Sequence, residues 1–178
     1  MRILGIDPGS IATGYGVVER VDGRLVHVAH GTLRAARGAC LAERLASLHR
    51  DVVEVVARHR PDAAAVEEVF VAASPRAALV LGQARGAVLA ALGTAAVPVS
   101  EYAARTVKQS VTGSGAADKR QVQAMVRRSL ALEALPPADA ADALAVAICH
   151  AYAARLAAAG VLGRGRRRGR RLALRRAR

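Results

Sequence analysis

The sequence predicts an α/β domain whose mixed five-stranded sheet is flanked by helices, with its first three strands antiparallel. An apolar run over residues 2–7 ends in an acid, and a second run over 14–19 returns after a Pro-Gly turn. The Asp22-Gly23 pair is typical of a hairpin and leads into a third strand over 24–32. Beyond residue 40, segments with helical periodicity alternate with short apolar runs, which favours a sheet covered by helices.

The remaining elements follow from periodicity and from residues that begin or end helices. Apolar residues recur at helical spacing from Leu41 to Val56, and Pro61 ends that helix. Ser74 followed by Pro75 is a typical helix start. We expect helices over residues 41–59, 75–92, 101–110, 118–131 and 136–159, and the fourth and fifth strands over 63–67 and 97–99.

The composition indicates a folded protein with a basic surface. Lys and Arg number 27 against 14 Asp and Glu, a formal charge of +13, while 53% of the 178 residues are apolar. That apolar fraction excludes a disordered polyelectrolyte, and the positive charge favours a polyanionic partner such as nucleic acid. Cys40 and Cys149 have no metal-binding spacing. The longest apolar run, over residues 87–100, is interrupted and too short to span a membrane, so we expect a cytoplasmic protein with no membrane partner.

The charge is concentrated at the C-terminus. Residues 163–178 contain nine Arg and no acid, which leaves 18 basic and 14 acidic residues in the rest of the chain. We expect one folded domain over residues 1–160 and a basic, disordered tail over 161–178. Such a tail either binds phosphates without specificity or keeps the protein soluble.

Four carboxylates lie in apolar surroundings, where a charged group is costly. Asp7 and Glu67 each end an apolar strand, and Asp139 and Asp142 lie three residues apart on one side of the apolar last helix. Considered singly, Asp7 could serve as a turn residue and Asp139 as a helix cap. Buried together they would be strongly destabilising, and divalent cations with oxygen ligands would neutralise them.

Seven short segments follow one another in a specific order along residues 2–150. They are GIDPGS (5–10), TGYG (13–16), VEEVF (66–70), LGQARG (81–86), EYAAR (101–105), VKQ (107–109) and ADAADALA (138–145). This series resembles the RuvC family of crossover junction (Holliday junction) endodeoxyribonucleases, which have a ribonuclease H-like fold. The Arg-rich tail matches no motif of that family.

The resemblance implies an active site, a substrate and partners. It makes Asp7, Glu67, Asp139 and Asp142 the catalytic ligands of two Mg²⁺ ions, with Mn²⁺ as the alternative ion. Glu67 and Glu68 point to opposite faces of a strand, and the family motif favours Glu67. The resemblance also implies that a homodimer resolves four-way junctions by two symmetric cuts in recombination and repair, together with the RuvA tetramer and the RuvB ring helicase.

Basic and aromatic residues near the acids are the candidates for DNA contacts. Lys108 and Lys119, the only two lysines, match basic family positions and would hold phosphate; otherwise they are solvated helix residues. Phe70, the only Phe, would stack on an unpaired base; otherwise it is a core residue. Arg76 is a candidate contact with the DNA backbone. The helix over 75–92, with small residues at four-residue spacing, is the candidate dimer interface; otherwise it packs on its own sheet.

Other readings of the same residues stay open. The carboxylates would also serve a nuclease that cuts RNA–DNA hybrids or a transposase-like enzyme, and a non-catalytic junction-binding protein is a further alternative. The GIDPG segment is also similar to a phosphate loop of actin-like ATPases and sugar kinases, but these need two such domains. His27 and His30, three residues apart on an expected strand, should face opposite sides and make a poor metal pair.

Overall fold

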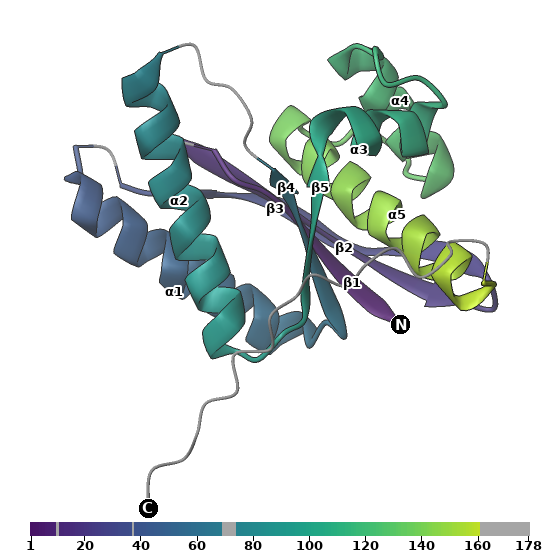
Figure 1. The fold of residues 1–178 in the computed structure, drawn as a ribbon, viewed down its shortest axis with the longest axis horizontal. Coiled ribbons are helices and arrows are strands. Elements are labelled where there is room, and N and C mark those ends of the chain that lie inside the picture. The colour runs from purple at the N-terminus through teal and green to yellow at the C-terminus, as the bar shows by residue number, and fades with distance from the viewer. Residues whose placement is uncertain (10, 37, 69–73, 161–178) are drawn as a thin grey trace, which may run out of the picture.

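A computed structural model describes residues 1–9, 11–36, 38–68 and 74–160 of the chain (Figure 1). Its elements, in chain order, are β1 (Arg2–Asp7), β2 (Ala12–Val21), β3 (Arg24–Arg34), α1 (Leu41–His59), β4 (Ala63–Glu68), α2 (Pro75–Thr94), β5 (Val99–Ala103), α3 (Ala104–Thr112), α4 (Lys119–Ser129) and α5 (Ala138–Ala158). The strands form one sheet in the order β3-β2-β1-β4-β5. β2 pairs antiparallel with β1 and β3, whereas β1, β4 and β5 are parallel to one another. The predicted fold class is confirmed.

The largest shift from the expected elements is at the fifth strand. The apolar segment 97–99 predicts a strand, but β5 runs from Val99 to Ala103. Pro98 has no amide hydrogen for a strand ladder, and its carbonyl accepts the amide of Ala64 near the start of β4. The amide of Val97 donates to the Leu92 carbonyl and closes the end of α2. Val97 and Pro98 therefore belong to the loop between α2 and β5. The strand itself begins at Val99 and extends into the more polar residues that follow.

Helices cover both faces of the sheet and enclose two apolar cores. Figure 1 shows α1 and α2 on one side and α5, with α3 and α4 beyond it, on the other. Alternate residues of β1 point to opposite sides, so Leu4 packs with Val88 and Leu92 of α2 while Ile3 belongs to the core with Ile148 of α5. The domain thus has the three-layer arrangement that its alternating sequence pattern predicts.

Helix α5 lies directly against the sheet because glycines face it. A Cβ atom added to Gly5 would lie 2.1 Å from the Ala143 carbonyl oxygen, and one added to Gly14 would lie 1.9 Å from that of Asp139. Any side chain at either position would push the helix away. The close approach sets the height of the first turn of α5 above the end of β1.

Two helices of the described residues, α2 and α5, have the length and composition of a membrane span. In α5, 61% of the apolar stretch is buried within the protein, as in the core helix of a globular domain. In α2 only 22% is buried, so this helix presents an apolar face outward.

The histidines on β3 depart from the expected alternation. Val17 pairs with Ala29 and Val18 with His27, which leaves Val28 as the extra residue of a β-bulge. The bulge shifts the alternation by one residue and places His27 and His30 on the same face. Their Nε2 and Nδ1 atoms are 2.8 Å apart, so the expectation that they face opposite sides was wrong.

Candidate active site

The carboxylates come from the ends of two neighbouring strands and from the start of α5. Asp7 is the last residue of β1, and the parallel pairing of Ile6 with Val66 places Glu67 of β4 beside it. On the other neighbour of β1, Gly14 pairs with Asp7 and lies against the backbone of Asp139. Sheet register and helix contact together bring three distant segments to one end of the sheet.

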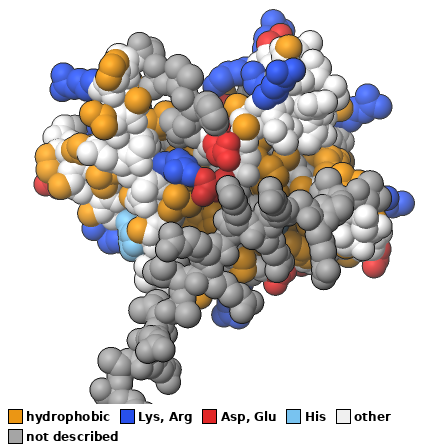
Figure 2. All heavy atoms as spheres, in the orientation of Figure 1, with side chains coloured by type: hydrophobic (Ala, Val, Ile, Leu, Met, Phe, Trp, Pro, Cys, Tyr) orange, Lys and Arg blue, Asp and Glu red, His pale blue; other side chains and the backbone are white. Residues whose placement is uncertain are grey.

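A cavity of about 260 Å³ opens at this end. Asp7, Glu67 and Asp142 line it together with Lys108 of α3 and Lys119 of α4, and its apolar walls are Ala104, Val107, Val122 and Ala145. Figure 2 shows acidic side chains near the middle of the visible face, with a basic side chain beside them. Three of the four predicted carboxylates and both lysines therefore share one cavity.

The cavity is costly for negative charge. Burial is the main reason that the pKa of Asp7 rises from 3.8 to about 7, and the neighbouring charges of Glu67 and Asp142 raise it further. Burial and the charge of Asp142 likewise raise the pKa of Glu67, while Lys108 and Lys119 oppose that rise. The lysines thus offset only part of the repulsion among the acids.

Basic side chains hold both carboxylates of α5. Lys119 Nζ lies 3.2 Å from Asp142 Oδ2, and Asp142 is the main reason that the pKa of Lys119 is raised. Asp118 caps α4 by accepting the Gln121 amide at 2.8 Å, which fixes Lys119 at the start of the helix. Asp139 Oδ2 lies 3.3 Å from Arg34 Nη2 of β3. Asp139 thus lies beside the cavity, near enough for its charge to affect the pKa of Asp7.

The four carboxylates lie near one another, but their side chains are not arranged as a closed metal site. Within the parts of the chain that the structure describes, no three His, Cys, Asp or Glu side chains are near enough to enclose one metal ion. Asp139 and Asp142 instead form ion pairs with the basic side chains of Arg34 and Lys119. The donor set nevertheless consists of carboxylate oxygens, which hard divalent cations prefer.

The other predicted contacts fall in different places. Arg76 starts α2 and lines a separate shallow groove with Ile11 and Arg44, outside the carboxylate cavity. Phe70 lies outside the described residues, and Glu68 is not among the residues that line the cavity. Arg34 was not predicted as a site residue, because a lone arginine at the end of a strand in an Arg-rich chain gives no signal in the sequence.

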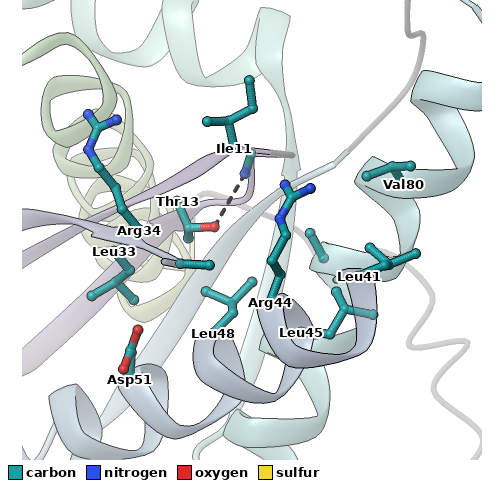
Figure 3. A pocket seen from close by; sticks show the side chains of 13 residues that line it. Ile11, Thr13, Leu33, Arg34, Leu41, Arg44, Leu45, Leu48, Asp51 and Val80 are labelled. Carbon is teal, nitrogen blue, oxygen red and sulfur yellow. Dashed lines mark hydrogen bonds between the residues drawn. The ribbon is translucent and has the colours of Figure 1, made fainter. Parts of the chain in front are cut away.

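A second pocket lies next to the site, between the β2–β3 pair and helices α1 and α2. Figure 3 shows an apolar floor of Leu41, Leu45 and Leu48, with Arg34 and Arg44 at its edge. Its free volume is only about 30 Å³, the space of a water molecule or two. We therefore assign it to packing between layers.

A mixed sheet of this strand order, with acidic side chains from β1, β4 and α5 at one end, defines a nuclease of the ribonuclease H-like class. The family model described as crossover junction endodeoxyribonuclease RuvC matches residues 3–150. The chain belongs to the RuvC family of crossover junction endodeoxyribonucleases, and the resemblance in the sequence is confirmed.

Relatives and solved structures agree with this assignment. The chain is 54% identical to RuvC of Ralstonia pickettii over 152 residues (85% of this chain and 84% of the relative) and 55% identical to that of Paramagnetospirillum magneticum (85% and 92%). A structure of Thermus thermophilus RuvC in complex with a Holliday junction substrate has a TM-score of 0.82 and 40% identity, covering 88% of this chain and 96% of that one. A yeast mitochondrial Holliday junction resolvase, at 11% identity and a TM-score of 0.58 over 83% and 76% of the chains, shares the fold.

Proposed function

We propose that the carboxylate cavity is where this chain, as a family member, cuts four-way DNA junctions with the help of divalent metal ions. The observation that carries the proposal is the convergence of Asp7, Glu67 and Asp142 with Lys108 and Lys119 on one cavity. Acids and lysines together are the groups that phosphodiester hydrolysis requires, because negative charge develops on both the attacking and the leaving oxygen.

The residues present fit a pair of hard divalent cations. The pKa of Asp7 is raised to about 7, first by burial and then by the charges of Glu67 and Asp142, and a bound cation would offset both costs. We propose Mg²⁺, or Mn²⁺ in its place, as the physiological ion, with two ions for each site. Bound there, such ions would lower the pKa of an attacking water and would stabilise the leaving oxygen.

Each side chain has a separate task in this proposal. Asp7, on the central strand, would be the ligand shared between the two ions. Glu67 would complete one ion site, and Asp139 and Asp142 would complete the other. Lys119 is 72% exposed, so its ammonium group can reach a phosphate, and a divalent ion would replace it as the partner of Asp142, whose side chain is only 20% exposed. Lys108 would hold the same strand from α3. Arg76, outside the cavity, and Phe70 would also contact the DNA.

The substrate favours a dimer, and α2 offers a surface for one. A four-way junction has two-fold symmetry, so a dimer with two identical sites can cut two strands symmetrically. On α2, Leu79 is 69% exposed, and Cβ atoms added to Gly82 or Gly86 would meet nothing within 4 Å. We propose that two copies pack through this face. Leu79→Glu should convert the dimer to a monomer in light-scattering measurements, whereas Glu54→Gln on the exposed side of α1 should not; an unchanged mass for the Leu79 variant would contradict the interface.

The cellular setting follows from the family. We propose that the protein acts in the cytoplasm during homologous recombination and DNA repair, next to the RuvA tetramer and the RuvB helicase. We also propose that residues 161–178 form a separate basic tail, outside the nuclease domain of residues 1–160.

The decisive test is cleavage by a variant of one carboxylate. Asp139→Asn should abolish Mg²⁺-dependent cutting of a mobile four-way junction and leave junction binding nearly intact, because the amide keeps the shape and loses the charge. Asp51→Asn on α1 is the matched control and should cut normally. Cleavage by the Asp139 variant at the wild-type rate would refute the assignment, and preferential cutting of an RNA–DNA hybrid by the wild type would refute the substrate.

A further inference from the structure

Arg34 is the basic side chain that contacts Asp139. It is the last residue of β3, and its Nη2 donates a hydrogen bond to Asp139 Oδ2 at 3.3 Å. Its side chain is 61% exposed, and that of Asp139 is 38% exposed. Figure 3 shows the guanidinium group extending away from the leucines of α1, at the edge of the neighbouring pocket. Among the described residues, Asp139 is thus the hydrogen-bond partner of the Arg34 side chain, which is otherwise mostly exposed.

The contact places Arg34 in the same relation to Asp139 as Lys119 has to Asp142. Each carboxylate of α5 pairs with one basic side chain from another element. Asp139 pairs with Arg34 of β3, and Asp142 pairs with Lys119 of α4. A divalent ion bound by Asp139 would repel the guanidinium group and compete with it for the carboxylate oxygens. Because the pair is exposed, breaking it costs little.

We propose that Arg34 is a positioning residue of the active site, which holds Asp139 while the cation site is empty and turns to a DNA phosphate when a divalent ion replaces it. This inference rests on the proposed role of Asp139 as a metal ligand. The planar guanidinium group suits a phosphate as well as a carboxylate, so it loses no hydrogen-bonding partner in the exchange.

The exchange links the two binding steps. Arg34 opposes the ion as long as DNA is absent, and it gains a phosphate partner only after the ion has taken Asp139. Ion and junction should therefore each strengthen the binding of the other by the same factor. A basic residue that simply touched DNA at all times would produce no such coupling.

The first measurement is Mn²⁺ binding to the DNA-free protein, followed by the paramagnetic signal of the free ion. Arg34→Gln should bind Mn²⁺ about fivefold more tightly, the effect of removing one positive charge a few ångströms from a divalent ion at physiological salt. Arg44→Gln, on the same side of the molecule without a carboxylate partner among the described residues, is the matched control and should change affinity by less than about twofold. Unchanged or weaker Mn²⁺ binding by the Arg34 variant would overturn the inference.

The second measurement is junction binding with EDTA and with Ca²⁺. Arg34→Gln should bind a four-way junction like the wild type in EDTA and several-fold more weakly in Ca²⁺. An equal loss in both solutions would make Arg34 a permanent phosphate contact and overturn the exchange. Asp139→Asn separates the two proposals: if it leaves Mn²⁺ affinity unchanged, the metal role of Asp139 fails. If it weakens Mn²⁺ binding while Arg34→Gln has no effect, only the role of Arg34 fails.

Discussion

Replacing Asp7 with Asn should stabilise the metal-free protein at alkaline pH while it destroys the proposed ion site. The pKa of Asp7 is raised from 3.8 to about 7 in the fold, mainly by burial, so folding takes up a proton between these two values. The free energy of unfolding therefore falls as the pH rises from about 4 to about 7. At about 1.4 kcal/mol for each pKa unit, the charged carboxylate costs the folded state about 4 kcal/mol above pH 7, and relaxation of the site leaves about 2–4 kcal/mol to be regained by Asn.

The assay is urea unfolding in EDTA at pH 4.5, 6 and 8, followed by far-UV circular dichroism because the chain has no Trp. The stabilisation by Asp7→Asn should be largest at pH 8 and small at pH 4.5, where the wild-type carboxyl is protonated in the fold. Added Mg²⁺ should stabilise the wild type and not the variant. Glu54→Gln, at an exposed position of α1, controls for the general loss of a negative charge. A stability difference that is independent of pH, or a less stable variant at pH 8, would refute the reasoning.

Three further predictions test the scaffold and the tail. Gly14→Ala should lower both the melting temperature and the cleavage rate, with a loss of about 2 kcal/mol or more, because its Cβ would lie 1.9 Å from the Asp139 carbonyl oxygen; an unchanged melting temperature would argue against the close contact. Tyr102→Phe should cost about 1–2 kcal/mol in urea unfolding, because its hydroxyl lies 2.9 Å from Nδ1 of the buried His150, and no loss would mean that this hydrogen bond does not stabilise the fold. Deleting residues 163–178 should weaken DNA binding mainly at low salt, whereas an equal loss at all salt concentrations would indicate a structural role for the tail.

Much of the fold could be predicted because local signals and tertiary structure agree. The Asp22-Gly23 turn has positive φ at both residues, as the hairpin requires, and Ser74 caps α2 by accepting the Ala77 amide at 3.2 Å. Of the candidate site, Asp7 and Glu67 could be found because an acid at the end of an apolar strand is unusual, and both line the cavity. Their catalytic roles remain a prediction.

The rest depends on information that no single segment carries. The bulge at Val28 that brings His27 beside His30 arises from the pairing of two strands, and no local signal marks it. Arg34 reaches Asp139 across 105 residues of chain, through contacts that the periodicity of either segment does not contain. Contacts that depend on strand register or on the packing of a helix against the sheet can be seen only in the folded structure, and the local sequence does not predict them.

The spacing of the proposed metal ligands depends on glycines of the sheet, which have no side chain to hold α5 away. Asp7 is attached to a strand, Asp139 and Asp142 are attached to a helix, and glycines such as Gly5 and Gly14 allow the sheet and the helix to touch. A larger residue at either glycine would widen the site although it never meets DNA or metal. Random mutagenesis selected for junction cutting should therefore tolerate as little change at these two silent positions as at the acids themselves.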